Sequence, residues 1–365
     1  MSSPKSRKAH LQERDGRIFM HLFWVDRMTA EQVKGLEFPN AGVDRTKNRL
    51  WELARKRYLK SEVRRTGGEG NNVITLFSLE KKTRAAVAQD LLYEHGLDKR
   101  RLFGLWESDP TAEWRQSPYN QETSGLDELD ASKAYHLERV SGTYARLAPS
   151  LDRHVGRAGV HWLWRNERRA ARPYTRHATS HWYLPDAELV LEFPREVGDP
   201  AAPGPEPYHL FIEYQTEASR KTSREIAEKV ETHALASTRP GFPEVERRVL
   251  VFSAEDHDHA EAAVKAARRL GVPILAGHPK EILKALRSVF ADVGAGVRPN
   301  LGEAAGAGRR PSPQGTTAEL EADDAEPPTT VSPGPESRGS EDPSEHAVAR
   351  GGEALSPPAF ATPGS

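Results

Sequence analysis

Three acidic residues and one glutamine in the middle of the chain have types and spacing that could support chemistry. Glu213 and Gln215 lie two positions apart in the apolar stretch YHLFIEYQT, and strand alternation would place them on one face. Asp186 follows a proline at the start of another apolar stretch, and Glu167 follows a third. Clustered carboxylates suit Mg²⁺, which can activate water and stabilise charge on a phosphate. The pattern therefore predicts that Asp186 and Glu213 hold Mg²⁺.

The order of these residues resembles the core of the PD-(D/E)xK nucleases, which have an early acid, then Pro-Asp, then Glu-x-Lys. The resemblance implies a restriction-endonuclease-like fold with the catalytic residues Asp186, Glu213, Gln215 and Glu167. Gln215 stands where these nucleases usually have lysine, so a positive charge is missing from the strand. Lys221 and Lys229, on the helix expected next, are candidates to replace it.

Other interpretations of this region stay open. Acids at strand ends are often solvated or paired with arginine, and arginines occupy positions 168, 169, 172 and 224. We therefore expect a nuclease-like fold that serves binding or assembly without catalysis. An active nuclease and a different α/β domain are the alternatives, and a DNA cleavage assay with Mg²⁺ would separate them.

The elements that must position these residues alternate between strands and helices. Apolar stretches predict strands at 160–164, 179–193, 208–216, 248–253 and 272–276. Helical periodicity predicts helices at 131–147, 220–236, 260–270 and 279–290. This alternation favours a mixed sheet covered by helices.

The N-terminal region predicts three helices and a β-hairpin. Asp15 is the expected N-cap of the first helix, and Thr29 with Gln32 forms a capping-box pattern for the second. Asp44 or Thr46 is expected to cap a third helix that runs to about residue 58. Alternating stretches at 59–63 and 73–77 flank a tip rich in glycine and asparagine, and a helix at 80–92 follows.

Three helices and a hairpin with a basic tip are typical of a winged helix-turn-helix. Such a helix fits the major groove of DNA, and the hairpin can contact the adjacent backbone. We predict DNA contacts from Arg45, Lys47, Asn48, Arg49, Arg55, Arg64 and Arg65. The alternative is a module that contacts only protein, with these side chains merely solvated.

Charge and composition divide the chain. Residues 1–110 carry a net charge of about +7 and residues 301–365 about −7, although the total is −1. Cysteine is absent, which excludes disulfides and thiolate zinc sites. No stretch has the apolar length of a membrane span or a signal peptide, so we expect a cytoplasmic protein that does not contact membranes.

These patterns together predict an α+β, multidomain protein. Its expected parts are a disordered basic start at 1–13, a winged-helix domain at 14–106 and a linker at 107–130. A nuclease-like α/β domain at 131–293 and an acidic tail at 294–365 follow, and the tail is too polar to fold.

Several stretches also resemble the replication-relaxation family of bacterial plasmids and other mobile elements. They are RDGRIFMHLFWVDRMTAEQV, RTKNRLWELARKRYL, LPDAELVLEF and FIEYQTEASRKTSREIAEKVETH. The resemblance covers about residues 14–286 and implies a winged-helix protein that acts in plasmid replication or DNA relaxation. This chain has Tyr214 and Gln215 where valine or tyrosine and then aspartate are commoner.

We therefore expect a DNA-binding accessory protein of plasmid or mobile-element replication or relaxation. Its expected partners are double-stranded DNA, replication or relaxosome proteins, and a second copy of the chain. One alternative is a Mg²⁺-dependent endonuclease or nickase that uses Asp186 and Glu213. Another is a transcriptional regulator of a mobile element.

Overall fold

The computed structural model describes residues 11–65, 73–93, 131–177, 179–194, 207–217, 221–239 and 242–297. All of them belong to one unit, Met1–Arg310. The expected linker, the hairpin tip and nearly all of the basic start and acidic tail lie outside the described residues. The chain is an α+β protein with helices and a mixed sheet, which confirms the predicted fold class at that level.

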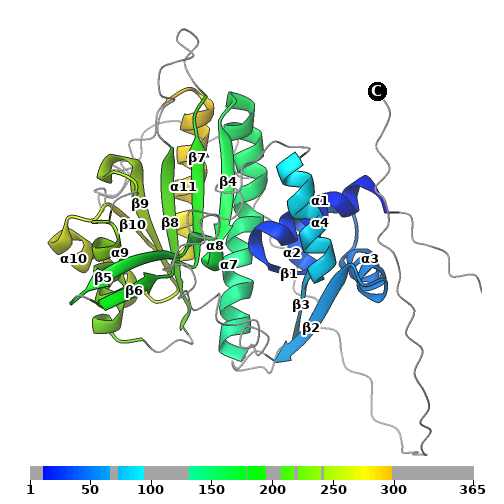
Figure 1. Cartoon of the computed structure of the whole chain (residues 1–365), viewed down its shortest axis with the longest axis horizontal. Coiled ribbons are helices and arrows are strands. Elements are labelled where there is room, and N and C mark those ends of the chain that lie inside the picture. The colour runs from blue at the N-terminus through cyan, green and yellow to red at the C-terminus, as the bar shows by residue number, and fades with distance from the viewer. Residues whose placement is uncertain are drawn as a thin grey trace, which may run out of the picture. The chain divides into compact units, whose positions relative to one another are not determined.

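The N-terminal segment has three helices, a small sheet and a further helix (Figure 1). The helices are α1 (Glu13–Val25), α2 (Ala30–Glu37), α3 (Val43–Arg55) and α4 (Lys81–Tyr93). Strands β1 (Arg27–Thr29), β2 (Leu59–Arg65) and β3 (Val73–Leu79) form an antiparallel sheet in the order β1-β3-β2. The predicted hairpin is therefore present, with its strands two residues longer than expected.

The helix starts differ in part from those predicted. Thr29 caps α2 through the capping box with Gln32, as expected. Asp15 is the third residue of α1 rather than its N-cap, because the helix begins earlier and the Asp15 carboxylate accepts a bond from the Gln12 backbone. Gly42 is the N-cap of α3, so Asp44 and Thr46 lie inside the helix. A positive φ of 60° at Arg57 turns the chain into β2 and ends α3 before residue 58.

The second segment is built on a five-stranded mixed sheet in the order β10-β9-β8-β7-β4. Its strands are β4 (His161–Asn166), β7 (Ala187–Glu192), β8 (Tyr208–Gln215), β9 (Arg248–Ala254) and β10 (Ile274–Gly277). β4, β7 and β8 pair antiparallel, whereas β8, β9 and β10 pair parallel. The predicted mixed sheet is confirmed.

A separate hairpin forms from β5 (Arg172–Arg176) and β6 (Thr179–Tyr183). The sequence predicted one strand over 179–193, but β6 and β7 belong to different sheets. Pro185 lies between them and has no N–H to donate to a strand ladder, which favours a break at this point.

Helices cover both faces of the five-stranded sheet. The helices of this segment are α7 (Ala131–Ser150), α8 (Glu167–Ala170), α9 (Ser223–Ala236), α10 (His257–Leu270) and α11 (Pro279–Gly294). Shorter helical turns are η1 (Leu151–Val155), η2 (Gly156–Ala158) and η4 (Val245–Arg247). Alternation in β8 sends Leu210 and Ile212 into one apolar cluster with α7 and α11, and Phe211 into another with α9 and α10.

Helix α7 joins the N-terminal segment to the sheet (Figure 1). It packs on α2 and β1 on one side and on α11 and β8 on the other. The Gln32 amide donates to the Glu138 backbone carbonyl at 2.7 Å, and the Tyr144 hydroxyl lies 2.7 Å from Nδ1 of His21. One apolar cluster therefore runs through both segments. None of the helices described here combines the length and the apolar character needed to cross a bilayer.

A buried carboxylate on β7, that of Glu188, is the centre of a cluster of charged side chains. Glu188 is fully buried and accepts bonds from Arg172 at 2.6 Å, Arg165 at 3.1 Å and His209 at 2.7 Å. Burial raises the pKa of Glu188, but the two arginines outweigh burial and hold that pKa far below its usual range. The cluster stabilises the fold, because Glu188 pairs with Arg172 and Arg165 and all three residues are buried.

Replacing Glu188 with Gln should lower the free energy of unfolding by about 3 to 5 kcal/mol, because two buried guanidinium groups lose their counterion. Urea unfolding at pH 7 measures the loss, with Glu228→Gln as the control, because the Glu228 side chain on α9 is exposed. The wild-type contribution is present above the unfolded pKa of the carboxyl and falls as the pH drops below about 4.5. Equal stability of the two variants at pH 7 would contradict this role.

Candidate active site

The topology brings Asp186 to the end of β8. β7 runs antiparallel to β8, and Ala187 pairs with Ile212, so the residue before β7 lies beside the last residues of β8. The Tyr214 backbone N–H donates to Oδ2 of Asp186 at 2.6 Å. The sequence prediction that Asp186 and the Glu213-x-Gln215 pair lie together agrees with this geometry.

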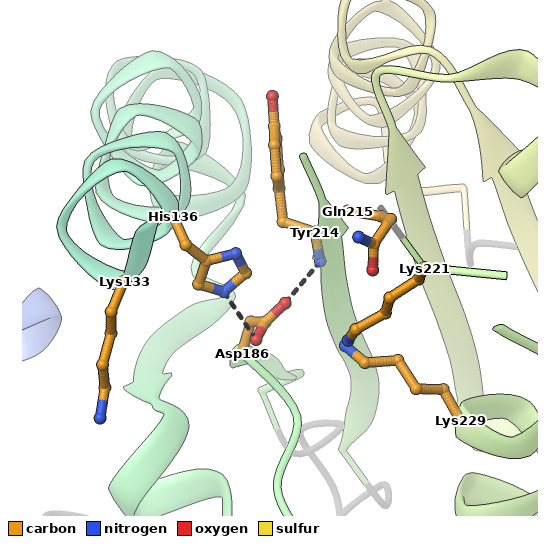
Figure 2. A pocket seen from close by; sticks show the side chains of 7 residues that line it. All are labelled: Lys133, His136, Asp186, Tyr214, Gln215, Lys221 and Lys229. Atoms are coloured by element: carbon orange, nitrogen blue, oxygen red, sulfur yellow. Dashed lines mark hydrogen bonds and ion pairs between the residues drawn. The ribbon is translucent and has the colours of Figure 1, made fainter. Parts of the chain in front are cut away.

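Asp186 is held from two sides (Figure 2). Besides the Tyr214 backbone, Nε2 of His136 on α7 lies 2.9 Å from Oδ1. Burial raises the pKa of Asp186, but His136 and Lys229 outweigh burial and hold that pKa well below its ordinary value. Burial is the largest effect on His136 and lowers its pKa, but the charge of Asp186 and its hydrogen bond, with a smaller effect from Glu167, together outweigh burial, so the net shift is upward. Asp186 is therefore a fixed anion.

Glu213 is paired with a lysine from the next helix. Its side chain is 3% exposed, and Oε2 lies 2.6 Å from Nζ of Lys229 on α9. Glu213 shares its face of β8 with Phe211, and that face packs against α9. Burial raises the pKa of Glu213 to about 7, although Lys229 opposes the shift. Lys229, one of the two candidates from the sequence, therefore places its ammonium group beside Glu213.

A pocket of about 230 Å³ opens beside these groups. It is lined by Lys133, His136, Asp186, Tyr214, Gln215, Lys221 and Lys229 (Figure 2). Gln215 is buried, with Nε2 lying 3.4 Å from the Thr216 carbonyl. The Glu213 carboxylate is held by Lys229 and is not among these lining residues. The site is therefore a polar hollow in which lysines outnumber acids.

Glu167 lies at the edge of this arrangement. It is the first residue of α8, directly after β4. Its negative charge adds to the upward shift in the pKa of His136, behind the larger effect of Asp186. Glu167 is not among the described residues that line the pocket. Of the four predicted catalytic residues, Asp186, Glu213 and Gln215 thus come together at the end of β8, and the charge of Glu167 also acts on His136 there.

His136 and Lys133 were not predicted as site residues. They lie three positions apart on α7, which places both on one face of that helix. Their spacing alone is ordinary for a helix, and Asp186 lies 50 positions after His136 in the chain. Only the packing of α7 across the end of β8 brings them to Asp186.

The raised pKa of Glu213 predicts a pH-dependent stability. Because the folded pKa lies above the unfolded value, the folded protein holds a proton between about pH 4.5 and 7 that the unfolded chain releases. The free energy of unfolding should therefore fall as the pH rises through this window. Glu213→Gln should remove this part of the fall, measured by urea unfolding at pH 5, 6 and 7. An unchanged pH profile would show that Glu213 does not titrate there.

The predicted DNA-contacting residues divide into two groups. Arg45, Lys47, Asn48 and Arg55 are exposed on α3. Arg49 instead donates to Asp15 and to Glu52, the latter at 2.6 Å, and its side chain is only 16% exposed. A buried aspartate needs a counterion, so Arg49 stabilises the fold.

The hairpin and the apolar face of α3 also depart from expectation. Arg64 lies 3.7 Å from Glu62 on its own strand, and the Arg65 side chain lies outside the described atoms. Trp51 on α3 is 39% exposed and packs edge-on against Phe77. An exposed tryptophan therefore lies among the free cations of α3.

One group of histidine and acidic residues, at the start of α10, has the spacing of metal ligands. Asp256 caps α10, accepting from the Asp258 backbone N–H at 2.9 Å. His257, Asp258 and Glu261 form an exposed cluster, which is common without a metal. The family assignments from the sequence stay predictions. No family model matches the chain, and neither a curated protein nor a solved structure shows significant similarity to it.

Proposed function

We propose that this protein binds double-stranded DNA and cleaves phosphodiester bonds at the pocket beside Asp186. The observation that carries the proposal is the position of Lys229, whose ammonium group meets Glu213 next to Asp186. Two acids and a lysine are the set that the resemblance to PD-(D/E)xK nucleases implies. In this protein the lysine comes from helix α9 rather than from strand β8. A positive charge is therefore present although Gln215 occupies the strand position where these nucleases usually have lysine.

Oxygen atoms of the kind that a hard divalent cation prefers lie at the end of β8, where each carboxylate is already paired with a cation of the chain. Asp186 and Glu213 offer carboxylate oxygens, and Gln215 offers an amide oxygen from the same strand end, which is the chemistry that Mg²⁺ prefers. We infer that these residues would hold it. When bound, such an ion lowers the pKa of a water and stabilises charge on a phosphate.

The chain's own groups have distinct tasks in this proposal. His136 and the Tyr214 backbone fix the Asp186 carboxylate in one orientation. Lys229 remains charged, since Glu213 and Asp186 raise its pKa against burial, and it can stabilise negative charge that develops on a phosphate oxygen.

The N-terminal segment supports DNA binding. The order of its helices and strands, with the sheet β1-β3-β2, supports the winged helix-turn-helix that the sequence predicts. Helix α3 packs mainly on α2 and β2, and Figure 1 places it on the side away from the five-stranded sheet. A duplex can therefore reach the exposed cations of α3, where a helix in the major groove would contact phosphates and bases.

A DNA-binding accessory protein that does not cleave is the second candidate. It is favoured by the way both carboxylates are already satisfied, Asp186 by His136 and Glu213 by Lys229. In either case the resemblance to the replication-relaxation family implies a role in plasmid replication or DNA relaxation.

The test is cleavage of supercoiled and linear DNA by the full chain with Mg²⁺ or Mn²⁺, each with an EDTA control. The proposal expects metal-dependent nicking that disappears in an Asp186→Ala/Glu213→Ala variant. The same background for both proteins would reject cleavage. If DNA binding then persisted, the accessory role would be the better account.

A further inference from the structure

Lys221 is a cation without a counterion in the described part of the chain. It precedes Thr222, the N-cap of α9, and its backbone carbonyl lies 2.8 Å from Nε2 of His259, which anchors this turn. The side chain lines the pocket. Among the described residues, no carboxylate oxygen lies within ion-pair distance of its ammonium group. The hydrogen bond to His259 thus fixes the backbone of Lys221, and the Lys221 side chain extends from it into the pocket.

The ammonium group of Lys221 meets that of Lys229. Figure 2 shows the ends of the two side chains meeting, Lys221 from above and Lys229 from below, and the two groups interact directly. Burial and the charge of Lys229 lower the pKa of Lys221. Like charges held together cost free energy unless an anion lies between or beside them.

The acids of the pocket are already engaged. Glu213 pairs with Lys229, and Asp186 pairs with His136, whose pKa is raised. Each carboxylate thus pairs with its own cation, and Lys221 adds a further positive charge that Glu213 and Asp186 attract without forming an ion pair with it. The charge balance of the pocket therefore favours an anion as its occupant.

We propose that Lys221 and Lys229 together bind a phosphate group of a nucleic acid in this pocket, without requiring a metal. Lysine ammonium groups bind phosphate as point charges, and two of them at one pocket wall could each donate to a different oxygen. The inference deepens the proposed function, on which the identity of the ligand rests. The phosphate could be a backbone phosphodiester or a terminal phosphomonoester, and both offer the same anionic oxygens.

The first test measures phosphate binding in EDTA, which removes metal-dependent cleavage. Inorganic phosphate is titrated by calorimetry into the full-length wild type, Lys221→Met and Lys265→Met, the last removing an exposed lysine of α10. Wild type and Lys265→Met should bind alike, and Lys221→Met about tenfold more weakly, the effect of one charge-assisted hydrogen bond. Equal affinity in all three proteins, or no binding by wild type, would overturn the proposal.

A fold control and a source control complete the test. Lys221→Met should unfold at the same or a higher temperature than wild type without phosphate, because a repulsion is removed, whereas unfolding at a lower temperature would contradict the charge balance. Single-stranded oligonucleotides with a 5′-phosphate or a 5′-hydroxyl, bound in EDTA, identify the source. If wild type prefers the oligonucleotide with a 5′-phosphate and Lys221→Met does not, the pocket binds a terminal phosphate. If Lys221→Met loses the same affinity for both oligonucleotides, the pocket binds a backbone phosphate.

The outcomes separate this inference from the proposed function. If phosphate binding depends on Lys221 but wild type does not cleave DNA, the phosphate site is supported and the nuclease activity is rejected. Cleavage by wild type without Lys221-dependent binding of phosphate or oligonucleotide would do the reverse.

Discussion

Replacing Lys229 with Met is expected to reduce DNA cleavage at least about 100-fold and to destabilise the protein by about 3 kcal/mol at pH 8. Glu213 is 3% exposed and would lose the ammonium group that lies 2.6 Å from its carboxylate. An unpaired buried carboxylate neutralises by taking up a proton, so the loss of stability should shrink at pH 6. Urea unfolding at both pH values and a plasmid cleavage assay measure the two effects.

The double variant Glu213→Gln/Lys229→Met is the matched control. It removes both charges of the pair, so it should regain most of the stability that Lys229→Met loses. Cleavage should stay low in the double variant, because the groups that act on the phosphate are still missing. Recovery of cleavage together with stability would mean that the pair serves only the fold.

The second large effect concerns α3. Replacing Arg45, Lys47 and Arg55 with Ala should weaken binding to duplex DNA at least about tenfold at 0.1 M salt and reduce the salt slope by about 3. All three side chains are exposed, so their removal should leave the unfolding temperature nearly unchanged. Fluorescence anisotropy at several salt concentrations measures both affinity and slope.

A triple variant of Lys265, Arg268 and Lys284 to Ala removes as many exposed cations from α10 and α11. This control has the same net charge, so it separates a local contact from the overall field of the protein. Equal weakening by the two triple variants would argue against α3 as the DNA-binding surface. Arg49→Ala is expected to destabilise the fold instead, because it leaves Asp15 buried without its guanidinium partner.

Local sequence patterns predicted much of the fold. The alternation of YHLFIEYQT gave β8, and the capping box at Thr29 marked the start of α2. The position of Asp186 beside Glu213 was also predictable, because a residue before one antiparallel strand meets the end of its neighbour. These features depend on contacts between residues close in sequence or on adjacent strands.

The missed features depend on packing between distant segments. His136 reaches Asp186 only because α7 crosses the end of β8, and Asp15 meets Arg49 only because α1 packs beside α3. Lys221 and Lys229 were recognised as candidates, but their mutual contact, and hence the excess charge of the pocket, required the turn before α9. Periodicity reports which face of an element is apolar, not which other element it meets.

The most direct test of the central claim is the single-turnover rate of phosphodiester cleavage by the full chain with Mg²⁺, compared with Asp186→Asn. Asparagine keeps the shape of the side chain but removes the charge that His136 holds in place. The account predicts a rate at least about 100-fold lower in Asp186→Asn, with a Kd for duplex DNA that stays within about twofold of wild type. Equal rates for the two proteins, or a wild-type rate that is the same in EDTA, would contradict it.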